Sequence, residues 1–136
     1  MITTSSVLTL ALAKVFGAYM IAGGLSHFMQ RNLWADLLEN FRAQPGVTFL
    51  AGIVTFTIGS AIVMAHNIWT DPLAGFISLV GWVALIEGLI IIAWPKPLIA
   101  FSKSLMKPAF INAFAVLTIL GGVVLVAMGF LGQAGL

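Results

Sequence analysis

Residues 73–94 read LAGFISLVGWVALIEGLIIIAW, and this stretch decides the class of fold. It holds one charged residue, Glu87, in a run long enough to cross a hydrocarbon layer of roughly 30 Å, which takes about 20 helical residues. A segment that crosses lipid must satisfy its own backbone hydrogen bonds, and an α-helix does so without a partner. The stretch therefore predicts a transmembrane helix.

Three more stretches of the same kind lie outside this one, at residues 7–28, 47–66 and 110–131. Lys14 is the only Lys, Arg, Asp or Glu within them. Over the 136 residues, 61% are hydrophobic and 7% are charged, whereas a water-facing surface requires roughly a quarter charged residues. We expect an all-α membrane protein, a single four-helix transmembrane domain over residues 1–136.

The basic residues outside the spans lie in two connections, at 29–46 and 95–109, while the connection 67–72 has Asp71 and no Lys or Arg. Basic loops stay on the cytoplasmic side of a membrane, so we expect both termini to lie outside. The net charge of +2 is too small to indicate a nucleic-acid partner. These loop residues are Arg31, Arg42, Lys96, Lys103 and Lys107.

Both basic connections have apolar residues spaced on one helical stripe, at residues 31–42 and 97–107. This pattern is typical of short amphipathic helices that lie in the plane of the interface. Lys96, Lys103 and Lys107 would then bind anionic lipid, or would only follow the rule that sets topology. The bilayer itself is the one partner that the composition requires.

The order span, amphipathic helix, span occurs twice, at about 7–66 and about 73–131. Each unit crosses the membrane twice, so the two copies would point the same way. We expect two tandem hairpins that form a parallel repeat. The alignment matches Gly17 with Gly81 and Gly24 with Gly88.

Each span carries two glycines seven residues apart, nearly two helical turns, so each pair lies on one helix face. Small residues let transmembrane helices approach closely, and we expect these faces to pack within the chain or between subunits. Hinges or a cavity are the functional alternative. The eight residues are Gly17, Gly24, Gly52, Gly59, Gly81, Gly88, Gly122 and Gly129.

Lys14 and Glu87 are the charged residues at membrane depth, where charges are costly and often functional. They would form a buried ion pair that docks the two repeats, or Lys14 would extend outward alone. Alternatively, Glu87 would titrate and exchange protons or cations. Asn112, near the start of the fourth span, is a second candidate partner of Glu87.

His66, Asn67, Trp69 and Asp71 follow the second span and would form a small outward-facing site. The alternative is an ordinary helix C-terminus, with His66 on the helix dipole and Asn67 in the left-handed conformation. His66 and His27 are expected at opposite membrane faces, so they would not ligate one metal or haem within one chain, whereas an oligomer could still assemble such a site. With no cysteine in the chain, we expect no metal site and no cofactor.

The stretch from about 43 to 95 resembles a group of small, uncharacterised four-helix bacterial inner-membrane proteins. The resemblance implies the same four-span fold and a place in the bacterial inner membrane, and it brings no known activity. The residues that carry it are Gly52, Gly59, His66-Asn67-x-Trp69, Gly81-Trp82, Gly88 and Pro95.

No arrangement of nucleophile and base is visible, so we expect a protein that is not an enzyme. The leading hypothesis is an accessory or scaffold subunit of a larger membrane complex, or a homo-oligomer, because the glycine faces favour helix association. The alternative is a small proton- or ion-coupled transporter or channel that uses Glu87 and Lys14.

Overall fold

The computed structural model describes residues 3–30 and 32–135, and this part of the chain folds into six helices and two short strands. Four of the helices are long and apolar enough to span a membrane. They confirm the predicted all-α membrane fold, and their bounds fall within two residues of the predicted spans. They are α1 (Val7–Met29), α3 (Pro45–Ala65), α4 (Pro72–Ala93) and α6 (Pro108–Leu131).

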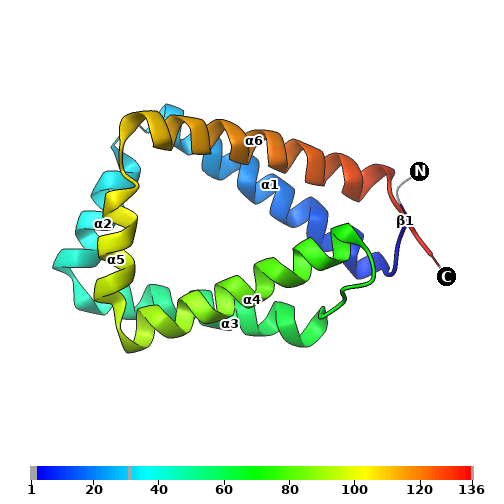
Figure 1. Cartoon of the computed structure of the whole chain (residues 1–136), viewed down its shortest axis with the longest axis horizontal. Coiled ribbons are helices and arrows are strands. Elements are labelled where there is room, and N and C mark those ends of the chain that lie inside the picture. Colours follow the sequence, from blue (N-terminus) through cyan, green and yellow to red (C-terminus); the bar gives the residue numbers. More distant parts are fainter. Residues whose placement is uncertain (1–2, 31, 136) are drawn as a thin grey trace.

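The two remaining helices, α2 (Leu33–Ala43) and α5 (Pro95–Ser104), lie together at one end of the molecule (Figure 1). We call this the basic end; Arg31 lies outside the described residues. The opposite, terminal end holds the first and last described residues and the connection between α3 and α4 (Figure 1). There β1 (Thr3–Thr4) pairs in parallel with β2 (Gln133–Ala134).

The helix starts follow from local chemistry. Proline stands at the first helical position of α3, α4, α5 and α6, where its missing N–H is not needed and its fixed φ suits a helix. The first turn of α1 is capped instead by Ser6, whose hydroxyl accepts from the Thr9 N–H.

The transmembrane helices form two close pairs, α1 with α6 and α3 with α4 (Figure 1). Neither pair consists of the two spans of one predicted hairpin, which would be α1 with α3 and α4 with α6. The sequence alignment of the two halves contained no information about which spans pack together. The packing therefore joins the first span to the last and the second to the third.

Glycines bring the backbones of each pair together. A Cβ on Gly17 would lie 2.6 Å from the carbonyl oxygen of Gly122, and one on Gly122 would lie 2.7 Å from the carbonyl of Gly17. In the other pair, Gly59 and Gly88 face backbone atoms of Leu85 and Phe56 too closely for any Cβ. All eight glycines of the four seven-residue pairs lie against a helix of their own chain.

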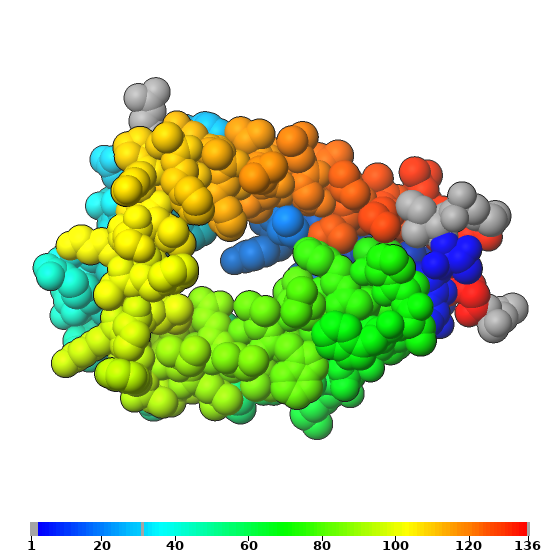
Figure 2. All heavy atoms as spheres, in the orientation of Figure 1, coloured from blue at the N-terminus to red at the C-terminus, as the bar shows by residue number. Residues whose placement is uncertain are grey.

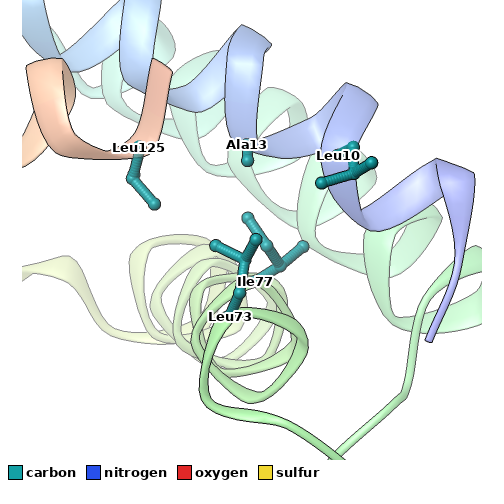
Figure 3. Packing of buried hydrophobic residues seen from close by; sticks show 5 residues of the cluster. All are labelled: Leu10, Ala13, Leu73, Ile77 and Leu125. Carbon is teal, nitrogen blue, oxygen red and sulfur yellow. The ribbon is translucent and has the colours of Figure 1, made fainter. Parts of the chain in front are cut away.

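The two helix pairs meet at the terminal end. Leu10 and Ala13 of α1 pack there against Leu73 and Ile77 of α4, and Leu125 of α6 joins the same cluster (Figure 3). Away from this cluster, Figure 2 shows an opening between α4 and α6 that α5 closes at the basic end. The molecule is thus a frame whose long sides are helix pairs.

Candidate functional site

The most buried polar side chains lie at the terminal end, around His66. His66 follows the last residue of α3 and is fully buried, as are Thr9 of α1 and Ser78 of α4. Its Nε2 lies 2.8 Å from the Thr9 hydroxyl, and its Nδ1 lies 3.1 Å from the Ser78 hydroxyl. One imidazole therefore links the first helix pair to the second.

One assignment of protons satisfies every group in this cluster. The Ile68 N–H donates to the Ser78 oxygen over 2.9 Å, and the Ser78 O–H donates to the Ile68 carbonyl over 2.8 Å. Ser78 then accepts from Nδ1–H of His66, and Nε2 accepts from the Thr9 hydroxyl. In the opposite tautomer, Nδ1 carries no proton and would accept the hydrogen bond of the Ser78 O–H. The Ile68 carbonyl would then lose that donor.

Asp71 ties the residues before α1 to the start of α4. One carboxylate oxygen caps α4 by accepting from the Ala74 N–H over 2.9 Å. The other accepts from the Thr4 hydroxyl over 3.0 Å and from the Ser5 N–H over 3.2 Å. Burial raises the pKa of Asp71, but these hydrogen bonds outweigh burial and hold the pKa below its ordinary value.

Asn67 and Trp69 form a separate, exposed group. The Asn67 side-chain oxygen accepts from the indole N–H groups of Trp69, over 2.8 Å, and of Trp82, over 3.2 Å. No described non-glycine residue has a positive φ, so Asn67 is not in the left-handed conformation. The four residues of the predicted outer cluster thus make three different sets of contacts and do not converge on one site.

Lys14 and Glu87 do not form the predicted ion pair; among the described residues, the ion pair joins Arg42 and Glu39 at 2.8 Å. The Lys14 ammonium lies over the ring of Phe130, 4.6 Å from its centroid, a cation–π contact. At 1.5 Å per residue, Lys14 lies about 10 Å along α1 and Glu87 about 22 Å along α4 from the terminal end. Glu87 is exposed and makes no hydrogen bond to any described residue.

Asn112 bonds to His27 rather than to Glu87, with 2.7 Å between its Oδ1 and the imidazole Nε2. His27 lines an apolar cavity of about 470 Å³ between α1, α2, α5 and α6, which we call the His27 cavity. Its walls are mainly aromatic and aliphatic, and they include Tyr19, Phe110 and Phe114. No Lys or Arg of the described chain lines it.

A second cavity, of about 620 Å³, lies in the matching corner between α2, α3, α4 and α5. We call it the basic cavity, because Arg42, Lys96 and Lys103 line it. Lys107, the third lysine of the predicted lipid-binding surface, precedes α6 and is not part of its wall.

The described residues contain no group of three or more His, Cys, Asp or Glu side chains that could hold a metal ion. The two histidines also lie far apart. His66 contacts Thr9 of α1. His27 is on α1 too, about 27 Å farther along the helix than Thr9 at 1.5 Å per residue. The hydroxyl groups around His66 are used in hydrogen bonds between segments of the chain. The arrangement holds helices together, and none of its three side chains lines the His27 cavity or the basic cavity.

Sequence reasoning missed the partners of the polar groups: Thr9 and Ser78 for His66, Thr4 for Asp71, Trp82 for Asn67 and Phe130 for Lys14. One signal was available. Thr9 and Ser78 are polar residues near the same ends of their spans as His66, and polar groups in lipid need partners. The sequence did not show which spans adjoin, so these groups were not matched.

Searches with protein-family models, curated proteins and solved structures find no match to this chain. Its likeness to small inner-membrane proteins therefore stays an expectation.

Replacing Thr9 with Val should destabilise the fold by about 1–3 kcal/mol, because the buried Nε2 of His66 would lose its donor at nearly constant side-chain volume. The measurement is the free energy of unfolding in detergent. Thr57→Val is the matched control, because the Thr57 hydroxyl bonds only to the Ile53 carbonyl of its own helix. Equal losses in both variants would contradict a special role for the His66 cluster.

Acid should weaken the fold through Asp71. Because its pKa is lower in the folded chain, this carboxylate stabilises the fold above its ordinary pKa of about 4, and the stabilisation is lost as the pH falls through the folded pKa. Asp71→Asn should lower stability at neutral pH and flatten the decline below about pH 4. Asp36→Asn on α2 is the control, because it makes the same charge change elsewhere. If Asp36→Asn flattened the decline of stability at low pH as much as Asp71→Asn, the decline could not be assigned to Asp71.

Proposed function

We propose that this protein is a non-enzymatic membrane scaffold that associates with itself through one face of α4. The observation that carries the proposal is Glu87, an exposed carboxyl group at membrane depth with no described partner in its own chain. Ionisable groups within membranes almost always face a bundle interior, a water-filled cavity or a partner. A second copy of the chain would supply that cover.

Glu87 belongs to a stripe of exposed residues on α4. Phe76, Val83 and Ile90 recur every seven residues, and Glu87 falls between the last two on the same side of the helix. Gly81 and Gly88 of α4 face α3 within the chain, so this stripe is a different face of the helix. It has the spacing of a helix–helix seam, with one polar group that would hydrogen-bond across it.

The polar side chains elsewhere support a structural role. Side-chain hydrogen bonds between separate segments hold the terminal end together. They join His66 to Thr9 and Ser78, and Asp71 to Thr4. A scaffold needs such rigidity, whereas catalysis needs a group free to react with a substrate. An accessory role in a larger membrane complex would use the same α4 face.

Ion-coupled transport is the second candidate, because an unpaired Glu87 is free to exchange a proton. Lys14 gives this function less support, since it contacts Phe130 instead and lies about 12 Å nearer the terminal end at 1.5 Å per helical residue. Proton or cation flux in proteoliposomes that Glu87→Gln abolishes would favour transport over the scaffold.

The finer architecture belongs to the same proposal. We place both copies of the predicted repeat in parallel, with α1-α2-α3 corresponding to α4-α5-α6. A two-fold axis along the membrane normal would exchange α1 with α4 and α6 with α3, so it would turn the pair α1–α6 into the pair α4–α3.

We further place the basic end in the cytoplasm and the termini outside a bacterial inner membrane, because the basic loops favour that orientation.

The native chain lacks cysteine, so single-cysteine variants can test the seam. In a two-fold dimer the same stripe lies on both sides, so Val83→Cys should oxidise to a disulfide-linked dimer. Leu117→Cys, exposed on α6 outside the stripe, should stay largely monomeric. Replacing Glu87 with Leu should weaken cross-linking at Val83→Cys more than Glu87→Gln, which keeps a hydrogen-bonding group.

The mass of the wild-type protein in detergent provides an independent readout. The proposal expects a dimer after subtraction of bound detergent. A monomer, together with equal cross-linking at Val83→Cys and Leu117→Cys, would refute it.

A further inference from the structure

The basic cavity combines two kinds of surface that a phospholipid requires. Arg42 comes from α2, whereas Lys96 and Lys103 come from α5, so the three cations approach the cavity from both short helices. The rest of the wall is mostly apolar, with Phe49 of α3 and Ile91 of α4 among its residues. A single cavity of about 620 Å³ is thus bordered by both cationic and apolar side chains.

We propose that the basic cavity binds one anionic phospholipid, with its phosphate among Arg42, Lys96 and Lys103 and an acyl chain along the walls of α3 and α4. This site is independent of self-association through α4. A lipid phosphate would lie at the level of α2 and α5, which cross the basic end of the frame (Figure 1). Amphipathic helices at the membrane interface lie at this depth.

The charge around the cavity favours an anion. Glu39 neutralises part of the charge of Arg42 through their 2.8 Å ion pair, and the two lysines remain in excess. Lys103 is near enough to Glu39 to help lower the pKa of that carboxyl, after the larger effect of the Arg42 hydrogen bond. Cationic side chains of α2 and α5 therefore lie close enough together to act on the same carboxyl group.

Comparison of the two matching corners supports a specific site. The His27 cavity lies between α1, α2, α5 and α6 and has no described Lys or Arg in its wall. If the lysines served only to orient the chain, their position relative to the cavities would not matter. Instead Lys96 and Lys103 line one cavity, while Lys107 lies outside both.

The test measures retention of phosphatidylglycerol on the purified full-length protein by native mass spectrometry. Lys96→Gln and Lys103→Gln should each weaken binding about five-fold, which is the contribution of roughly 1 kcal/mol that a lysine makes near an anionic lipid surface. Lys107→Gln makes the same charge change outside the cavity and should weaken binding less than two-fold. Arg42→Gln also frees Glu39, so the lysine variants give the cleaner comparison.

Two further probes identify what is bound. Phosphatidylcholine with the same acyl chains should bind at least ten-fold more weakly, and inorganic phosphate at equal concentration should not displace phosphatidylglycerol. Equal losses in Lys96→Gln and Lys107→Gln would show diffuse attraction and overturn the site. Equal binding of phosphatidylcholine, or displacement by phosphate alone, would overturn the choice of an anionic lipid. Far-UV circular dichroism of each variant checks that it is folded.

Discussion

The fold depends on how closely two helix backbones can approach where side chains are absent. In lipid, helices gain little by hiding apolar surface from one another, so packing contacts and hydrogen bonds must hold them together. Gly17 and Gly122 bring α1 against α6, and Gly59 and Gly88 bring α3 against α4. These contacts divide four spans into two closely packed pairs, and the remaining features concern how the pairs are joined.

The ends of the frame join the pairs in different ways. At the terminal end, a small apolar cluster is reinforced by the buried His66, whose ring bonds to Thr9 on one side and Ser78 on the other. At the basic end, the short helices α2 and α5 cross between the pairs and carry their cations beside a cavity. The polar and charged residues that connect helices or face the interface thus lie at the two ends, whereas Glu87 lies between the ends, within α4.

Much of the fold could be predicted because its causes are local. Span length follows from the thickness of lipid, and the prolines at residues 45, 72, 95 and 108 each stand at the first position of a helix. The glycine spacing indicated packing faces, yet it did not indicate that Gly17 would meet Gly122 rather than a glycine of the second span. That choice depends on contacts between segments more than 100 residues apart. The same distance in sequence explains why a Lys14–Glu87 pair was expected and a Lys14–Phe130 contact was not.

The pairing of α1 with α6 is the claim on which the remaining structure depends, and the cysteine-free chain allows a direct measurement. The Met20 side chain of α1 reaches Gly121 of α6, where a Cβ would meet only the flexible end of that side chain, at 3.1 Å. A variant with cysteine at both positions should therefore be linked within the chain by a short thiol cross-linker. A variant with cysteines at Met20 and Val54, on the two spans of one predicted hairpin, should stay unlinked. Mass spectrometry of the intact and digested protein reads both outcomes. A link between positions 20 and 54, with none between 20 and 121, would contradict the pairing.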